Sequence, residues 1–570
     1  MPIPQLTLSD YESRFADRHL LQDIVVKWAE ERPDALAIIN ADRAARGAEP
    51  STLSWVAFQA ATCKLASALR GLGLGKGDYL STSLPLLTEH ILLEFACFRL
   101  GVILAPLDLR LSPAEVIRSV NLIGAKAFAF LGKSPLADFR ELGRAVARNC
   151  SSVQHLIQFS PADELIENAR SFAALWGDSS AAAREFDIPV SPDDGALVIF
   201  TTGSTGSPKP ALLSHRNITC QCMCISQAFF GGDSGARTLV NLPASHVGCQ
   251  TELLMGTLFG GGTAVILETF DPARSLRAIQ EHKVNKIGQI PAIFNFEWRL
   301  RDYDSYDLSS LDFAAYGGQQ VSPAFLQKMA TMAPAIATGL GLTESAGFCT
   351  YAMQDSHAGT TGLASSLGAA MPVYPFTVRQ PMREDGYAGH ELPDGEIGHI
   401  CFRGPQSFLG YVGDPEATAR TLSGDGWLYT GDLGSRDQSG ALHLTGRAKW
   451  VIKSFGYQVF PADIENHICC LESSVASCAV VGAEHAIVGE AIVAFVERKP
   501  EAPLTVQNLD RHARALSSYM RPRHWVILEP GQMPLTRSLK ADYMRLSEIA
   551  RDEVARLRSE GKWDRGPSDL

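Results

Sequence analysis

Long apolar runs are missing from this sequence of 570 residues. No stretch approaches the roughly 20 consecutive apolar residues that a membrane-spanning helix needs, so no membrane span is predicted. The first residues carry prolines and acidic side chains, where a secretory signal would carry basic residues and an apolar core. These two features predict a cytoplasmic protein.

Concentrated positive charge is also missing. The 51 lysines and arginines face 62 aspartates and glutamates, which gives a formal net charge of −11, and no basic cluster stands out. Binding to nucleic acid or to an anionic membrane surface depends on such clusters. We therefore expect neither as a partner.

Cysteine is too sparse for a disulfide-stabilised fold. The 12 cysteines are scattered over a long chain, whereas disulfide scaffolds concentrate them in a short one. Cys220, Cys222 and Cys224 form one cluster, but no second pair with zinc-ligand spacing accompanies them. We expect buried structural thiols and no cysteine metal site.

A chain of this length exceeds one hydrophobic core and predicts two or more domains. Short apolar runs alternate with helical patterns, as where a helix over 86–100 leads into the strand VILAPL. Such alternation predicts an α/β fold with helices flanking parallel or mixed sheets and ligands at the carboxyl ends of strands. The segment from Gly446 to Gly456 is the expected domain boundary. We expect a large domain over 1–448 and a small α+β domain over 449–570.

The segment 198–215 reads VIF followed by TTGSTGSPKPALLSH and predicts a phosphate-binding loop after a buried strand. Gly203 and Gly206 free the backbone amides to face an anion, the hydroxyl side chains add donors, and Lys209 adds charge. The Walker loop differs, because its lysine directly follows the second glycine. The expected contacts are Thr201, Thr202, Gly203, Ser204, Thr205, Gly206 and Lys209.

This loop resembles T-S/T-G-S/T-T-G-x-P-K-G of the adenylate-forming superfamily, which comprises acyl-CoA synthetases, aryl-CoA ligases, luciferases and peptide-synthetase adenylation domains. The match covers Thr201 to Lys209 and fails at Pro210, where the family has glycine. Other motifs of the superfamily follow in order over nearly the whole chain. They are YGGQQ at 316–320, GLGLTE at 339–344, YTGDL at 429–433, IKSFGYQVFPADIE at 452–465 and PLTRSLK at 534–540.

The resemblance implies ATP and Mg²⁺ as ligands. Thr343 would touch the α-phosphate and Glu344 would bind the metal. Asp432 would contact the ribose, and Arg447 would contact the ribose or a phosphate. Leu340 replaces the aromatic residue that stacks on adenine in the family. The remaining residues expected around the nucleotide are Gly317, Gly318, Gln319, Gly341 and Leu342.

The resemblance also places an acid substrate beside the nucleotide. His246, which follows the residues LPAS, would help to position the substrate carboxylate. Aromatic and polar side chains are mixed among the other candidates, which suits a small aromatic acid slightly better than a long alkyl chain. These candidates are Phe294, Asn295, Tyr316 and Phe348.

The carboxyl-terminal motifs imply a mobile second domain. Lys449 matches the family's hinge, and Lys540 matches the lysine that bridges the acid carboxylate and the α-phosphate during adenylation. Lys453 is a candidate for the second half-reaction. Phe455 and Leu539 stand where the family has glycine.

The expected activity is ATP-dependent formation of an acyl-AMP from a small aromatic or medium-chain acid, with release of pyrophosphate, followed by transfer to coenzyme A. The acceptor could instead be a carrier-protein thiol, or nitrite in an ATP-dependent diazotisation of an aryl amine. A nucleotide sensor without catalysis is a further alternative, although Lys540 would serve no purpose in one. The sequence does not determine the oligomeric state, and a homodimer is possible.

Overall fold

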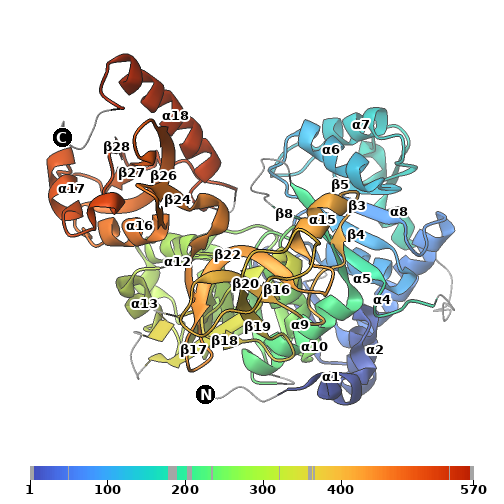
Figure 1. The fold of residues 1–570 in the computed structure, drawn as a ribbon. Helices are drawn as coiled ribbons and strands as arrows, with labels where there is room; N and C mark the ends of the chain where they lie inside the picture. The colour runs from blue at the N-terminus through green and yellow to red at the C-terminus, as the bar shows by residue number, and fades with distance from the viewer. Residues whose placement is uncertain are drawn as a thin grey trace.

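The computed structural model of the chain describes residues 6–48, 51–177, 189–201, 208–232, 235–319, 321–356, 362–363, 366–537 and 539–564. Figure 1 shows a large body, and a smaller body formed by the carboxyl-terminal elements stands against it. Five residues predicted to bind phosphate lie outside the described residues: Thr202, Gly203, Ser204, Thr205 and Gly206.

A nine-stranded sheet has the order β18-β17-β14-β13-β12-β10-β11-β1-β2. The six strands from β14 to β1 are parallel, and β17, β18 and β2 extend the two edges antiparallel. The strands are β1 Leu36–Asn40, β2 Thr52–Ser54, β10 Arg237–Val240, β11 Thr263–Ile266, β12 Lys286–Gln289, β13 Phe313–Tyr316, β14 Ala335–Thr338, β17 Thr350–Asp355 and β18 Ala369–Ala370.

An eight-stranded sheet has the order β21-β9-β8-β4-β3-β5-β6-β7, parallel from β8 to β7. β9 returns antiparallel to β8, so Thr201 pairs with Lys209 across the two ends of the predicted phosphate loop. The strands are β3 Tyr79–Ser83, β4 Ile103–Pro106, β5 Ala127–Leu131, β6 His155–Phe159, β7 Ala169–Ser171, β8 Gly195–Thr201, β9 Lys209–Ser214 and β21 Gly410–Tyr411.

Two helices of the large body are buried on nearly all sides. α5 (Thr88–Leu100) is buried on nearly every face, including its polar residues His90 and Glu94, and α9 (His215–Ala228) buries Cys220, Cys222 and Cys224. The other helices are α1 Leu8–Arg14, α2 Leu21–Glu31, α3 Ala41–Ala45, α4 Trp55–Gly71, α6 Pro113–Ile123, α7 Arg140–Asn149, α8 Phe172–Gly177, α10 Met255–Phe259, α11 Pro272–His282, α12 Pro291–Trp298, α13 Pro323–Met329 and α15 Pro415–Thr421.

A four-stranded antiparallel sheet follows, in the order β19-β20-β22-β23. Its strands are β19 Phe376–Arg379, β20 Gly398–Phe402, β22 Leu428–Arg436 and β23 Leu442–Arg447, and a small hairpin pairs β15 Gly341–Leu342 with β16 Gly347–Phe348.

The small body follows the 3-10 turn Ala448–Trp450 and has its own cores. Its sheet has the order β25-β24-β27-β26, with β28 parallel to β27. The elements are β24 Ile452–Ser454, β25 Tyr457–Val459, α16 Pro461–Cys469, β26 Val475–His485, β27 Gly489–Arg498, α17 Val506–Ala513, β28 His524–Leu528 and α18 Tyr543–Ser559. The fold is therefore the predicted α/β body with a smaller α+β body. No helix in the described part of the chain has the length and apolar content to span a membrane.

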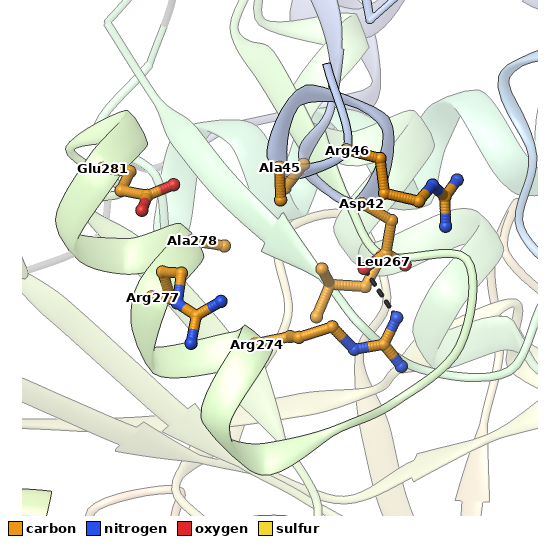
Figure 2. Close-up of a pocket in the computed structure, with 9 residues that line it drawn as sticks. Asp42, Ala45, Arg46, Leu267, Arg274, Arg277, Ala278 and Glu281 are labelled. Carbon is orange, nitrogen blue, oxygen red and sulfur yellow. Dashed lines mark hydrogen bonds and ion pairs between the residues drawn. The ribbon is translucent and has the colours of Figure 1, made fainter. Parts of the chain in front are cut away.

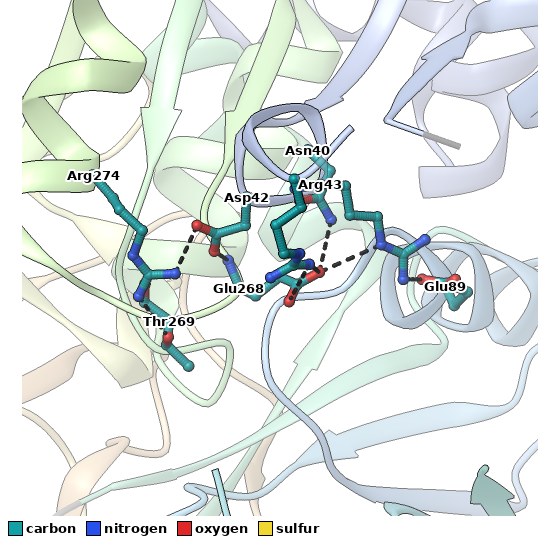
Figure 3. Close-up of polar contacts among 8 residues, drawn as sticks. Asn40, Asp42, Arg43, Glu89, Glu268, Thr269 and Arg274 are labelled. Atoms are coloured by element: carbon teal, nitrogen blue, oxygen red, sulfur yellow. Dashed lines mark hydrogen bonds and ion pairs between the residues drawn. The ribbon is translucent and has the colours of Figure 1, made fainter. Parts of the chain in front are cut away.

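A polar network ties α3 to both halves of the large body (Figure 3). Arg43 donates to Glu89 on α5 at 2.8 Å and to Glu268 after β11 at 3.4 Å. Asp42 accepts from the Glu268 amide at 2.8 Å and from Arg274 on α11 at 2.7 Å. Glu89 lies on α5, which connects β3 and β4 of the eight-stranded sheet, whereas Glu268 and Arg274 follow β11 of the nine-stranded sheet. The network therefore links the parts of the large body built on the two sheets.

Candidate active site

Two glycines leave bare backbone at the carboxyl end of β13. A Cβ atom on Gly317 would lie 3.0 Å from the ring of Phe348. Gly318 has φ +94°, and a Cβ atom there would lie 3.4 Å from Cε and 3.6 Å from Nζ of Lys540. Side chains at these positions would crowd the lysine and the aromatic ring, so glycine keeps a flat space open. Gln319 follows as an exposed residue.

Lys540 reaches this space from the small body. Its loop closes on itself, because the Thr536 amide donates to the Lys540 carbonyl at 2.7 Å and the Leu539 amide donates to the Thr536 carbonyl at 2.9 Å. Burial lowers the pKa of Lys540; the charge of Arg447 adds to this effect and that of Asp432 opposes it. The side chain stays accessible to solvent although protein surrounds it. We call the space beside Gly317 and Gly318 that Lys540 enters the cleft.

Asp432 and Arg447 face each other across β22 and β23. Arg447 Nε lies 2.8 Å from Asp432 Oδ1, and the aspartate side chain is only 7% exposed, whereas the arginine is half exposed. Burial raises the pKa of Asp432, and the charge of Arg447 counteracts it. The pair presents an acceptor and a cation to the cleft that Lys540 enters.

Glu344 lies in the 3-10 turn Thr343–Ser345, directly after Gly341 and Leu342 of β15. Tyr411 of β21 donates its hydroxyl to Glu344 Oε1 at 2.6 Å. Lys209 places its ammonium 5.1 Å from the ring centre of the same tyrosine. Tyr411 thus joins the predicted metal ligand to the end of the predicted phosphate loop. Sequence reasoning missed it, because a tyrosine in FLGYVGD carries no signal without its partners.

His246 stands just before the π-helical turn Gly248–Leu254. Its Nε2 lies 3.9 Å from Oδ2 of Asp108, whose carboxylate is held by Arg110. Burial lowers the pKa of His246, and the Asp108 charge opposes this shift. The ring is therefore neutral at physiological pH. Asp108 and Arg110 were also missed, since a D-x-R turn after a strand is common.

Phe348 packs edge-on against Phe229 at a centroid distance of 5.5 Å and borders Gly317. Glu252, on the π-helical turn, approaches the same region: a Cβ on Gly347 would lie 2.7 Å from its Oε1, and one on Gly248 would lie 3.6 Å from its Oε2. Burial raises the pKa of Glu252 to about 7, against the effect of the hydrogen bond from the Phe348 amide. Sequence reasoning did not single out this carboxylate.

Two residues expected in the acid site lie in the core instead. Phe294 has no exposed surface and packs on Trp298 and Phe325. Tyr316, the last residue of β13, also packs on Phe325. Both belong to the core cluster between α12, α13 and the nine-stranded sheet. For Tyr316 the physical reason is strand alternation, which turns its side chain to the face of β13 opposite Phe313. Phe294 is on the side of α12 that packs against Phe325 of α13. Asn295, next to Phe294, is exposed.

The structure separates the two carboxyl-terminal lysines. Lys453 lies on β24 with an exposed side chain, and its amide donates to Glu490 at 2.6 Å within the small body. Lys449 sits in the turn between the bodies, with its ammonium 4.1 Å from the ring centre of Trp450. Burial lowers the pKa of Lys449 to about 8, and Arg447 adds to the effect. Only Lys540 of these three enters the cleft beside Gly318.

A surface hollow of about 200 Å³ lies elsewhere, between α3 and α11 (Figure 2). Arg46 and Arg274 line it, but they pair with Glu268 and Asp42. Because these cations are already neutralised and no predicted site residue borders the hollow, we do not assign a substrate to it.

The side chains in the cleft fit a nucleotide with its metal. The described residues hold no cluster of three or more His, Cys, Asp or Glu that could enclose a metal on their own. Mg²⁺ needs no such cluster, since it is commonly held by one or two carboxylates together with substrate phosphates. Glu344 supplies one carboxylate, Asp432 offers acceptors suited to hydroxyls, and Lys209, Arg447 and Lys540 supply positive charge for phosphates.

Comparisons with known proteins identify the family. The family model described as AMP-binding enzyme matches residues 25–412, and the model of the AMP-binding enzyme C-terminal domain matches residues 463–540. The feruloyl-CoA synthase of Amycolatopsis sp is 30% identical over 461 residues, which cover 80% of this chain and 84% of that protein. The 4-coumarate--CoA ligase-like 6 of Oryza sativa subsp. japonica is 32% identical over 479 residues, which cover 80% of this chain and 75% of that protein.

Solved structures show the same fold. The amide bond synthetase McbA from Marinactinospora thermotolerans superposes with a TM-score of 0.80 at 24% identity and covers 93% of this chain and 100% of its own. ATP-bound MatB from Rhodopseudomonas palustris superposes with a TM-score of 0.78 at 23% identity; the match covers 93% of this chain and 99% of the MatB chain. The sequence matches over both bodies and the shared fold lead to one conclusion: the chain belongs to the AMP-binding enzyme family and is an AMP-forming ligase.

Proposed function

We propose that the protein activates a carboxylic acid with ATP as an acyl-AMP and then transfers the acyl group to coenzyme A. The observation that carries this proposal is the position of Lys540, which the small body inserts beside Gly318 and within the electrostatic influence of Asp432 and Arg447. A lysine so placed can meet a carboxylate and a phosphate together.

In the first step a carboxylate oxygen of the acid attacks the α-phosphorus, and pyrophosphate leaves with the electrons of the broken P–O bond. The acid is already an anion, so the protein needs no base; it must align two anions and offset their repulsion. Lys540 and Thr343 are suited to the α-phosphate, and Lys209 to the departing phosphates. When bound at Glu344, Mg²⁺ would neutralise charge on the phosphates.

Asp432 would accept hydrogen bonds from the ribose hydroxyls, because a buried carboxylate held by Arg447 offers two fixed acceptors. Gly317 and Gly318 leave room for flat groups against the backbone. Phe348 and His246 border the space proposed for the acid, which we take to be a small aromatic or medium-chain acid.

In the second step the coenzyme A thiolate attacks the acyl carbon and AMP leaves. We propose that residues 449–570 rotate about Lys449 for this step, which withdraws Lys540 and brings Lys453 to the cleft. Exchange of one lysine for another would let one acyl-AMP meet two chemistries in turn.

The test measures acid-dependent exchange of pyrophosphate into ATP over a panel of aromatic and aliphatic acids, and then AMP release with coenzyme A, with nitrite and with neither. We expect exchange with at least one aromatic acid and AMP release that coenzyme A accelerates. Lys540→Ala should abolish exchange and leave transfer from a supplied acyl-AMP largely intact. Exchange without any coenzyme A effect would refute the proposed acceptor, and equal loss of both half-reactions in Lys540→Ala would make that lysine structural.

A further inference from the structure

A short segment of the large body meets the Lys540 loop. It follows β4 and leads through Asp108 and Arg110 into α6, where Ser112 and Glu115 form a reciprocal capping box. The Glu115 carboxylate accepts from the Ser112 amide at 2.8 Å and from its hydroxyl at 2.7 Å. These bonds fix Glu115 at the start of a helix, where its negative charge is favourable.

Arg537 of the Lys540 loop makes two contacts with this segment. Its guanidinium forms an ion pair with Glu115, and its carbonyl accepts from Arg110 Nη1 at 2.8 Å. Side chain and backbone of one residue are thus held by two different partners. Such double attachment fixes a loop in position and orientation, which a single ion pair does not.

Arg110 is itself fixed. Asp108 accepts from Arg110 Nε at 2.9 Å and from Nη2 at 2.6 Å, a two-point contact that leaves Nη1 to reach the Arg537 carbonyl. Oδ2 of the same aspartate lies 3.9 Å from His246 Nε2. Asp108 therefore stands between the residue proposed to place the acid and the residue that receives the loop.

The position of Arg537 determines that of Lys540. The Thr536 amide donates to the Lys540 carbonyl, and the Lys540 amide donates to the Thr536 hydroxyl at 3.2 Å. The isolated pairing of Leu535 with Ala541 closes the base of the same loop. Because these bonds hold the loop together, restraint at Arg537 is passed to Lys540.

We propose that Asp108, Arg110, Glu115 and Arg537 form a docking clasp that holds the small body in the acid-activating orientation and so positions Lys540. This inference rests on the proposed two-step function. All four are positioning residues. The ion pair of Arg537 with Glu115 is about one-third exposed, so it can open when the small body rotates.

The clasp predicts an asymmetric effect on the two half-reactions. Glu115→Gln and Arg537→Ala should slow pyrophosphate exchange by about 10- to 100-fold, since small displacements of a positioning contact have effects of that size. Transfer from a supplied acyl-AMP to coenzyme A should stay the same or become faster. The control is Arg545→Ala, which removes an exposed arginine of α18 that pairs within its own body with Glu548.

A charge exchange separates positioning from general destabilisation. The double variant Glu115→Arg with Arg537→Glu restores the pairing with reversed sign, and it should recover a substantial part of the exchange rate that each single variant loses. Equal loss of both half-reactions, or no recovery in the double variant when all variants melt at the wild-type temperature, would overturn the clasp.

A second measurement needs no acid and therefore does not depend on the proposed function. Energy transfer is measured between a dye on Cys470, the exposed cysteine of the small body, and a dye on Glu141→Cys of α7. Glu115→Gln should broaden the distance distribution or shift its mean, while Arg545→Ala should not. An unchanged distribution in Glu115→Gln refutes the clasp even if the wild-type enzyme activates no acid in the panel.

Discussion

At the scale of the residue, two substitutions of the family's glycines occur at positions with the same backbone conformation. Phe455 has φ +53° and Leu539 has φ +59°, so both occupy the left-handed region at positions where the family has glycine. Phe455 and Gly456 are the two central residues of the turn between β24 and β25, and both have positive φ, as in a type I′ hairpin. Glycine is usual there because a side chain adds strain of about 1 kcal/mol or more. Sequence alone shows the substitution but not the backbone angle.

Leu539 precedes Lys540, so its backbone angle determines how the lysine enters the cleft. Leu539→Gly should keep the loop and leave pyrophosphate exchange within about twofold of wild type, because glycine adopts this angle freely. Leu539→Val should lower exchange by about tenfold, since a β-branched side chain is a genuine outlier at positive φ. Parallel measurement of exchange and melting temperature decides: similar rates in the two variants would show that this angle has no role in placing Lys540.

Glu252 predicts a dependence of acid binding on pH. Its pKa near 7 means that it is mainly protonated at pH 6 and mainly ionised at pH 8. If the acid binds beside Phe348, the KM for benzoate-like acids should rise roughly three- to tenfold from pH 6 to 8 through like-charge repulsion. An acid with a protonated amino group should show the opposite trend. Glu252→Gln should remove both trends, and a persistent trend in that variant would place Glu252 outside the acid site.

At the scale of elements, α5 buries a carboxyl group beside a histidine: Glu94 Oε1 lies 3.5 Å from His90 Nε2. Glu94 is fully buried; its Oε1 accepts from Gln250 at 2.7 Å, and its Oε2 has no partner among the described residues. Burial raises the pKa of Glu94 to about 8 and lowers that of neighbouring His90 to about 4. Both side chains are therefore neutral at pH 7, as a core helix requires.

The raised pKa of Glu94 predicts a loss of stability with rising pH. The unfolded side chain releases its proton near pH 4.5 and the folded one near pH 8, so this contribution is complete below about pH 4.5 and lost by about pH 8. Glu94→Gln should be more stable than wild type by about 4 kcal/mol at pH 8, and the difference should fall below about 1 kcal/mol near pH 5. Calorimetric unfolding at several pH values tests this, and a difference that does not grow with pH would contradict it.

The sequence predicted the elements better than it predicted their faces. The helix expected over 86–100 is α5, and the strand expected at VILAPL is β4. Periodicity and turn residues determine such elements locally. It did not predict that β9 returns antiparallel to β8, because nothing local distinguishes that return from a crossover to a parallel strand. It also misplaced Phe294 and Tyr316, because the direction of a side chain depends on which layer covers each face.

At the scale of the whole molecule, the relation between the two bodies depends on contacts far apart in the sequence. Motif order predicted that Lys540 and Lys453 act in two different half-reactions. Which one occupies the cleft follows from Arg537 meeting Glu115, more than 400 positions away. No local pattern encodes such a pairing, so the orientation proposed for acid activation could be recognised only from the three-dimensional structure.

The orientation of the bodies leaves an aromatic surface on the β24–β25 hairpin exposed. The exposed fractions are 46% for Phe455 and 58% for Tyr457, and Tyr457 stacks on Tyr519 at 4.4 Å. Lys453, on the same hairpin, is also exposed. Exposed aromatic groups of this kind commonly mark a surface that another surface covers. In the proposed rotation this hairpin is the part of the small body that moves toward the acyl-AMP.

Phe455→Gly tests this assignment without disturbing the turn, because glycine suits the positive φ that phenylalanine adopts there under strain. Pyrophosphate exchange should be unchanged, since the ring is exposed in this orientation of the small body. If the acceptor is coenzyme A, removal of the ring should widen the path of its long pantetheine arm and speed thioester formation several-fold. If the acceptor is a small anion, the same opening should admit water, so that hydrolysis of the acyl-AMP rises at the expense of transfer. Transfer and hydrolysis are measured separately from a supplied acyl-AMP. The control is Phe455→Asn, which also suits the turn but puts a small polar side chain in place of the ring. Unchanged rates of both processes in both variants would show that the hairpin does not approach the acyl-AMP, and that the rotation brings a different face of the small body to the cleft.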